Sequence, residues 1–175
     1  MTLTPPAAAR LGRTAKIAPA GLVRTSMRRP RDKIDRMQMY DALADWFHLL
    51  SDPADYADEV ATYTELIDAV CPKARTLLEL GSGGGNSASH LTERFDCTLT
   101  DISDRMLRLS ATINPQCDHI QGDMRELRLE RSFDVVFVHD AIVYMTTAED
   151  LSAAIATAYL HTRRGGVAVF VPDAT

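Results

Sequence analysis

The fold is decided by the stretch Thr76-Leu77-Leu78-Glu79-Leu80-Gly81-Ser82-Gly83-Gly84-Gly85-Asn86. Its first five residues form a short apolar run that meets glycine at once, which predicts a buried parallel strand over 76–80. The four glycines that follow let the backbone turn tightly and let a ligand approach the main chain. A plain flexible turn is the alternative. Because ligands of parallel α/β sheets bind at the carboxyl ends of the strands, the stretch predicts a binding crevice.

Strands and helices alternate after this turn. Two amphipathic helices, over 37–50 and from Pro53 to the residue before Pro72, precede the first strand. This order predicts an α/β fold with a doubly wound, mainly parallel, Rossmann-like sheet and helices on both faces. The strands are expected at 76–80, 97–101, 119–121, 133–138 and 167–171, the helices at 86–94, 103–114 and 147–161, and a turn at 163–166.

The first 35 residues differ from the rest. They hold four of the eight prolines and no clear apolar period, so we expect a mobile basic arm over 1–35 and a folded domain over 36–175. The Arg-rich, acid-free start also resembles a transit peptide, or an extension ahead of a start at Met27 or Met37. With 175 residues, 46% of them hydrophobic and 25% charged, the chain suits one globular domain and not wholesale disorder.

The charge is unevenly distributed along the chain. Residues 1–31 carry seven basic side chains and no acid, so the net charge of −5 leaves −12 on residues 32–175. Such an acidic body is a poor binder of phosphate backbones, which argues against a nucleic-acid partner. A cationic ligand suits it better.

Cysteine usage and hydropathy bear on the compartment. Cys71, Cys97 and Cys117 are isolated and form no C-x-x-C pair, so we expect neither a metal site nor a redox motif. A reducing compartment, the cytoplasm, fits this pattern. The sequence has no run of about 18 apolar residues, so no transmembrane helix and no membrane partner are expected.

Glu79 decides which kind of cofactor the glycine turn suits. The dinucleotide pattern G-x-G-x-x-G is not met, because Asn86 stands where the third glycine belongs. A carboxylate at position 79 repels phosphates and attracts an ammonium or sulfonium group. These two features favour a cationic cofactor over a nicotinamide one, and they disfavour the alternative of a nicotinamide oxidoreductase.

Two later acids follow strands that end at the same edge. Asp101 ends the second strand, where an acid can accept both hydroxyls of a ribose; the alternative is an ordinary acid near a helix N-terminus. Asp123 and Met124 follow the third strand, where they could hold an adenine ring by its amine and its face. The alternative for this pair is an ordinary Gly-Asp turn.

Taken together, the motifs resemble those of the class I S-adenosylmethionine-dependent methyltransferases. The resemblance covers residues 36–175 and is strongest for the small-molecule enzymes, including those that act on sugar amines. It rests on Glu79 to Gly85, Asp101, Gly122-Asp123-Met124, Phe133-Asp134-Val135-Val136 and Gly165-Gly166, with 55–59 and 142–144 pointing to the small-molecule type.

This resemblance implies S-adenosylmethionine as cofactor and methyl transfer, by in-line displacement, to a nitrogen or oxygen of a small-molecule substrate. Within it, Asp101 would bind the ribose, Asp123 and Met124 the adenine, and Glu79 the amino group of the methionine part. The full set of implied cofactor-binding residues is Glu79, Gly81, Ser82, Gly83, Asp101, Ile102, Asp123, Met124 and His139.

His139 and Tyr40 are the catalytic candidates. His139 would face the methionine end of the cofactor and the substrate, and with Asp140 it is a candidate base. The alternatives are a pocket wall for His139 and a loop cap for Asp140. Tyr40 would close over the cofactor or be a core aromatic side chain. Three further side chains would line a substrate pocket or be buried apolar residues, namely Trp46, His48 and Tyr144.

The family resemblance also sets an expectation for the last strands. It implies seven strands ending in an antiparallel hairpin, whereas this sequence stops after the fifth expected strand. The fifth strand would then have an unpaired edge, which a second copy or another partner could cover. The alternative to the enzyme is thus a shortened domain that binds the cofactor without turnover, or a dimerising module.

Overall fold

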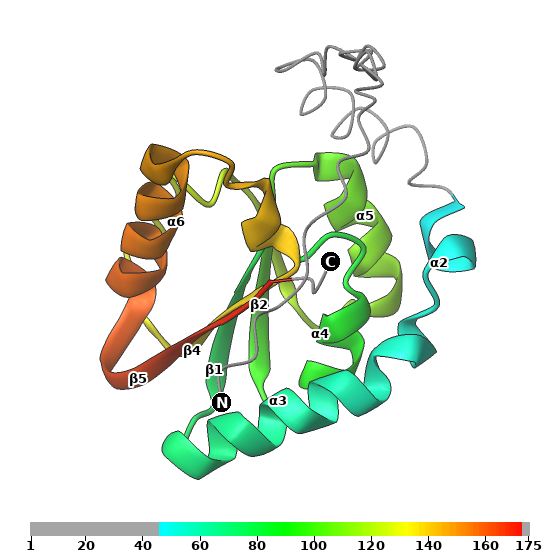
Figure 1. Ribbon diagram of the computed structural model, residues 1–175. Helices are drawn as coiled ribbons and strands as arrows, with labels where there is room; N and C mark the ends of the chain where they lie inside the picture. The colour runs from blue at the N-terminus through cyan, green and yellow to red at the C-terminus, as the bar shows by residue number, and fades with distance from the viewer. Residues whose placement is uncertain (1–45, 173–175) are drawn as a thin grey trace, which may run out of the picture.

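The computed structural model describes residues 46–172, which contain a five-stranded parallel sheet (Figure 1). Its strand order is β3-β2-β1-β4-β5, and all four neighbouring pairs run parallel. The expected arm over 1–35 and Tyr40 lie outside the described residues. The strands are β1 (Thr76–Leu80), β2 (Asp96–Asp101), β3 (Asp118–Gln121), β4 (Phe133–His139) and β5 (Thr162–Val171).

Three of the described helices begin at a capping side chain. Asp52 accepts a hydrogen bond from the amide of Ala54, Ser103 from Met106, and Thr147 from Asp150. None of the described helices is long and apolar enough to cross a membrane. The helices are α2 (Phe47–Leu50), η2 (Pro53–Tyr56), α3 (Ala57–Val70), α4 (Asn86–Leu91), α5 (Asp104–Ile113), η3 (Ala141–Tyr144) and α6 (Ala148–His161).

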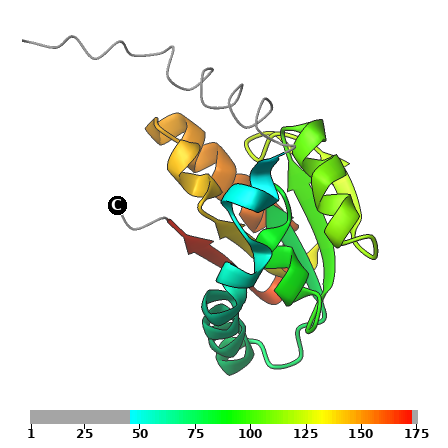
Figure 2. The same ribbon diagram turned by 90° about the vertical axis from the view of Figure 1, so that its right-hand side faces the viewer.

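The predicted α/β architecture, with helices on both faces of the sheet, is confirmed. Alternate side chains of β1 and β4 point to opposite faces, so Leu77 and Phe137 pack with α3 and α4. Leu78 and Val136 pack on the other side with Ala158 of α6. Figure 2 shows α3 in teal and α6 in orange. The four side chains named from β1 and β4 are fully buried, as expected for a doubly covered parallel sheet.

The predicted turn at 163–166 is wrong, because these residues belong to β5. Thr162 pairs with Phe133 and Val167 with Val135, so four residues of β5 stand opposite Asp134 alone. Gly165 has a φ of +80°, a left-handed conformation that glycine adopts without strain. Gly165 and Gly166, which predict a turn from the sequence, therefore form a bulge within β5 and do not end the strand.

Asp134 explains how this bulge is held. Its carboxylate accepts from Arg163 Nε at 2.5 Å and from the amides of Arg75 and Thr76 at 2.6 and 3.0 Å. Burial alone would raise the pKa of Asp134, but these hydrogen bonds and the Arg163 charge keep the pKa below its ordinary value. One acid thus ties the starts of β1 and β4 to the bulge of β5.

Candidate functional site

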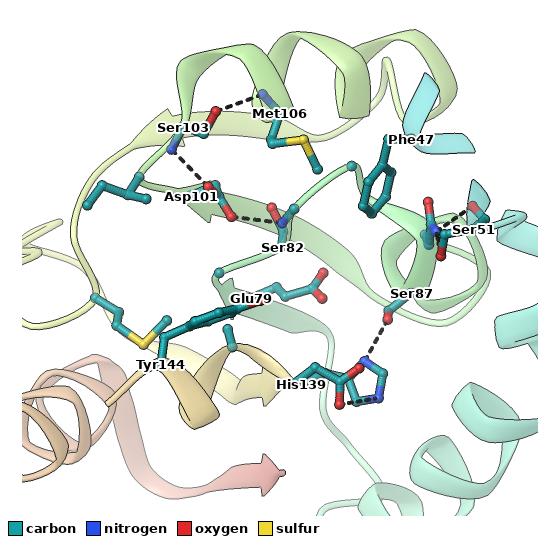
Figure 3. Close-up of a pocket in the computed structure, with 18 of the residues that line it drawn as sticks. Phe47, Ser51, Glu79, Ser82, Ser87, Asp101, Ser103, Met106, His139 and Tyr144 are labelled. Carbon is teal, nitrogen blue, oxygen red and sulfur yellow. Dashed lines mark hydrogen bonds and ion pairs between the residues drawn. The ribbon is translucent and has the colours of Figure 1, made fainter. Parts of the chain in front are cut away.

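A cavity of about 530 Å³ opens at the carboxyl ends of β1, β2 and β4 (Figure 3). It lies where the strand order reverses between β1 and β4, the usual ligand position in such sheets. The cavity is lined by every residue that the resemblance implied for the cofactor, namely Glu79, Gly81, Ser82, Gly83, Asp101, Ile102, Asp123, Met124 and His139.

Gly81 and Gly83 shape the cavity floor. Gly81 has a φ of +79°, and a Cβ atom there would collide with the side chain of Ala141. Gly83 has a φ of +53°, and the nearest atom to a Cβ there is Met106 Cε at 3.7 Å. A ligand can therefore approach the main chain at Gly83, as the sequence predicted for this turn.

Gly84 and Gly85 serve packing within the protein. A Cβ atom at Gly84 would lie 2.6 Å from the ring of Phe47, and one at Gly85 would collide with Ser110 Oγ. Asn114 Nδ2 also donates to the carbonyl of Gly85 at 2.9 Å. Gly81, Gly83 and Gly84 thus line the cavity, whereas Gly81, Gly84 and Gly85 leave room for neighbouring elements, and the sequence pattern does not reveal these roles.

Residues 47–51, which we call the strap, cover the turn from outside. His48 Nε2 donates to the carbonyl of Gly84 at 3.0 Å, and Asn86 Nδ2 donates to the carbonyl of Ser51 at 3.0 Å. Phe47, Leu50 and Ser51 line the cavity. Asn86, which departs from the dinucleotide pattern, therefore fastens the strap. No sequence signal at 47–51 pointed to this contact.

Of the three side chains predicted for a substrate pocket, one lines the cavity and two do not. Tyr144 lines the cavity. Trp46 is 61% exposed, and neither Trp46 nor His48 is among the described residues that line the cavity. The prediction is thus wrong for Trp46 and His48, because His48 uses its ring to hold the glycine turn.

Glu79 brings an unpaired carboxylate into the cavity. Its side chain is 2% exposed, and Oε2 has no hydrogen-bond partner within residues 46–172. Burial, with smaller contributions from Cys117 and Asp101, raises the pKa of Glu79 to about 8. Ser82 Oγ also lacks a partner in this part of the chain. Since buried polar atoms are normally paired, both atoms fit a ligand with a cationic donor group.

Asp101 connects the turn to the following helix. Its Oδ2 accepts from the amide of Gly83 at 2.9 Å, and its Oδ1 accepts from the amide of Ser103 at 2.8 Å. The alternative of a helix-start acid is therefore part of its role. The carboxylate also lines the cavity, where the ribose prediction places it.

The acid predicted to bind adenine is already paired with a cation. Asp123 accepts from Arg125 Nε at 2.9 and 3.0 Å, and Arg125 Nη1 donates to Asp150 at 2.8 Å. These two acids hold the pKa of Arg125 above its ordinary value. Arg125 itself lines the cavity, and it was not among the residues predicted for the site. An arginine two residues after the acid was the available signal.

His139 ends β4 with both ring nitrogens in hydrogen bonds. Nδ1 lies 3.2 Å from Ser87 Oγ, and Nε2 lies 3.2 Å from Glu59 Oε1. Figure 3 shows Ser87 and His139 side by side in the cavity wall. Asp140 is the N-cap residue of η3, with a φ of +53°, and its side chain makes no capping hydrogen bond there. No group of His, Cys, Asp or Glu within residues 46–172 could hold a metal ion.

Comparisons with known proteins agree with this geometry. A family model described as a methyltransferase domain matches residues 77–166. The dTDP-3-amino-3,4,6-trideoxy-alpha-D-glucopyranose N,N-dimethyltransferase of Streptomyces venezuelae is 33% identical over 80% of this chain and 58% of that protein. The crystal structure of S. venezuelae DesVI superposes with a TM-score of 0.67, at 33% identity over 76% of this chain and 57% of that one.

A second solved structure contains the cofactor. It is CalS10 with bound SAM, an amino pentose methyltransferase from Micromonospora echinaspora involved in calicheamicin biosynthesis. Its TM-score is 0.65, with 31% identity over 67% of this chain and 50% of that one. The chain thus spans between half and three-fifths of the length of these three relatives.

Proposed function

Because this chain belongs to the class I S-adenosylmethionine-dependent methyltransferases, we propose that it transfers a methyl group from that cofactor to an amine of a small molecule. The carboxylate of Glu79 carries the proposal, since it is buried, unpaired within the described residues and aimed into the cavity. Because burial favours the neutral form of Glu79, a ligand that carries an ammonium and a sulfonium group would stabilise its ionised form, whereas a pyrophosphate would oppose it.

The cavity supplies a set of residues for each part of the cofactor. Glu79 and Ser82, beside the open backbone at Gly81 and Gly83, suit the methionine part. Asp101 suits the ribose hydroxyls. Asp123, Met124 and Ile102 suit the adenine, with Asp123 held in place by Arg125. These assignments are supported by their common position on the cavity wall.

Methyl transfer asks the protein mainly for positioning. The sulfonium, when bound, supplies a methyl group that is already activated. The residues of the cavity must hold the acceptor in line and exclude water, which can lower the barrier by several kcal/mol. An amine acceptor needs only to be neutral, whereas a hydroxyl needs a stronger base. His139, with both nitrogens engaged, suits an amine better than a hydroxyl.

The acceptor class comes from the relatives. The S. venezuelae protein is named for a dTDP-linked amino sugar, and CalS10 is described as an amino pentose methyltransferase. We therefore propose a nucleotide-linked amino sugar as the substrate. A matched pair of sugars tests this choice, because the amino and hydroxyl forms differ in one group.

Two measurements test the proposed function. Calorimetry should show binding of S-adenosylhomocysteine and none of NADH; binding of NADH alone would reject the family role. Transfer of labelled methyl groups should occur to a dTDP-amino sugar and not to its hydroxyl analogue. Binding without any transfer would support the alternative of a non-catalytic binding domain.

We also propose a setting for the protein. The free thiols of Cys71, Cys97 and Cys117 support a reducing cytoplasm. The folded domain would span 36–175, with 1–35 as a basic arm. Within the described residues β5 pairs only with β4, so its outer edge could join a second copy. Light scattering should then give the mass of a dimer, and a monomer would exclude this interface.

A further inference from the structure

A hydrogen-bond path runs from the cavity wall to the surface. It begins at Ser87 of α4, which lines the cavity and is 4% exposed. It continues through His139, whose side chain is 5% exposed, and ends at Glu59 of α3, whose side chain is 43% exposed. Both steps measure 3.2 Å. The path therefore joins the cavity wall to solvent through three side chains.

The chemistry of the end group fixes the direction of this path. A carboxylate only accepts, so His139 Nε2 carries the hydrogen that faces Glu59. His139 Nδ1 is then the acceptor for the hydroxyl of Ser87. Although burial alone would raise it, hydrogen bonds from Tyr63 and His139 keep the pKa of Glu59 below its ordinary value. The terminal acid therefore stays ionised and able to accept.

Packing holds His139 in this orientation. Its ring stacks on Phe137 at 5.8 Å between centroids and 17° between planes. Tyr56 and Tyr63 contact it from η2 and α3. The charged or titratable groups that face the ring are thus Glu59, the two tyrosines and Asp140, whose Oδ1 lies 3.6 Å from Nε2.

We propose that Ser87, His139 and Glu59 form a proton-transfer chain that carries the proton released by the acceptor amine out to solvent. The inference rests on the proposed function. Methylation leaves the acceptor nitrogen with one more N–C bond and a positive charge. The nitrogen then gives a proton to Ser87 Oγ while Ser87 passes its own to His139 Nδ1. The Nε2 proton passes to Glu59 and then to water, which leaves His139 neutral with its hydrogen on Nδ1. Before the next transfer, exchange with water has to remove the Nδ1 hydrogen and return one to Nε2 through Glu59.

The chain would matter most for repeated methylation. A second methyl transfer to the same nitrogen requires that nitrogen to be neutral again. Ser87 lies in the cavity wall, so it offers this proton a route that does not pass through the mouth of the cavity. The dimethyltransferase relatives carry out two transfers, as their names state. In this chain Glu59 is a positioning residue, and Ser87 is the group that meets the amine.

Glu59→Gln tests the outer end, with Asp58→Asn as the matched control on the same helical turn. We expect kcat to fall about tenfold for Glu59→Gln, with the KM of the cofactor unchanged. The pH–rate profile of Glu59→Gln should also differ from that of Asp58→Asn, because the chain loses the carboxylate that accepts its proton. Equal kcat values and pH profiles for the two variants would overturn the proposal.

Ser87→Ala tests the inner end, with Ser89→Ala as its control. Ser89 lies on the same helix but bonds the carbonyl of Asn86. We expect the second methyl transfer to slow about tenfold in Ser87→Ala, so that the monomethyl product accumulates. The Ser87→Thr variant, which restores the hydroxyl, should recover most of the rate. A Ser87→Ala enzyme that behaves like Ser89→Ala would overturn the path.

Nitrogen-15 NMR of the ligand-free full chain tests the geometry without turnover. The His139 ring should carry its hydrogen on Nε2, and Glu59→Gln should change the ring signals where Asp58→Asn does not. A hydrogen on Nδ1 would overturn the chain. If wild-type protein transfers no methyl group while the NMR result holds, the proposed function fails and the hydrogen-bond path stands.

Discussion

The two ends of the cavity treat their acids in opposite ways. At one end Glu79 is buried with an oxygen that has no partner within the described residues. At the other end Asp123 is neutralised by Arg125, which also binds Asp150. Glu79 therefore lacks a cationic partner among the described residues, whereas Asp123 already has one. Ligand binding should therefore gain most from contacts at the Glu79 end.

The largest expected effect is on cofactor affinity when the Glu79 charge is removed. Glu79→Gln keeps the size of the side chain and loses the charge. We expect S-adenosylhomocysteine to bind about thirtyfold more weakly, which is about 2 kcal/mol for a charged hydrogen bond. Calorimetry measures it. An affinity within twofold of wild type would show that Glu79 does not contribute to cofactor binding and that the two ends of the cavity do not differ in this respect.

The same variant should change the pH dependence of stability. The pKa of Glu79 is raised to about 8 in the fold, above its ordinary value of 4.5, so its neutral form favours folding. This stabilisation is complete below pH 4.5 and is lost as the pH rises toward 8. Without ligand, the melting temperature of Glu79→Gln relative to wild type should rise by more than about 3 °C between pH 5 and pH 8. A constant difference in scanning calorimetry would contradict the buried, unpaired state.

Asp101 lies between the two ends and should give the next largest effect. Asp101→Ala removes a cavity acceptor and the anchor of the amides of Gly83 and Ser103. We expect cofactor binding to weaken at least tenfold, or about 1.4 kcal/mol. Asp101→Asn, which keeps one acceptor for these amides, serves as the control and should lose less. An unchanged affinity in Asp101→Ala would exclude the ribose role.

A change in the contact between the strap and the glycine turn should have a smaller effect on cofactor binding. In Gly84→Ala the new methyl group displaces Phe47, so the strap should lift and the cofactor should dissociate about fivefold faster, from the loss of about 1 kcal/mol of packing. Phe47→Ala in the same chain removes the clash, so the two changes should not add. The single tryptophan, Trp46, lies next to the strap, and its fluorescence reports the displacement. Additive effects would show that Phe47 and Gly84 do not interact.

The smallest effect is expected at the far end. Arg125 is 31% exposed, so Arg125→Gln should cost under about 1 kcal/mol of folding free energy. Cofactor affinity should change less than about twofold, since Asp123 remains in place. Urea unfolding and calorimetry test both values. A loss as large as that of Glu79→Gln would mean that the two ends depend on their charges equally.

Most of the fold could be predicted because its signals are local. The apolar run before Gly81 and the caps at Ser103 and Thr147 place their strands and helices within a few residues. The bulge in β5 escaped because glycines at 165 and 166 predict a turn, while the pairing that keeps them in the strand depends on Asp134. The sequence around Gly165 and Gly166 gives no information about Asp134, which lies about 30 positions earlier in the chain.

The candidate site divides along the same line. Residues next to strand ends, such as Asp101 and His139, were predicted because the topology of the sheet fixes where those ends lie. Contacts between distant segments were not: Phe47 against Gly84, Asn86 with Ser51, and Glu59 with His139. The last of these joins residues 80 positions apart, and no periodicity in the sequence relates them.

The strap has a consequence for how this binding unit could be reused. His48 and Gly84 are 36 positions apart, with all of α3 and β1 between them. A graft of β1, the turn and α4 into another parallel sheet would transfer the glycine turn that lines the cavity, but not the strap that packs against that turn. A working chimera would need the segment from Phe47 onward. In a host without that segment, a glycine at position 84 would have no ring to accommodate.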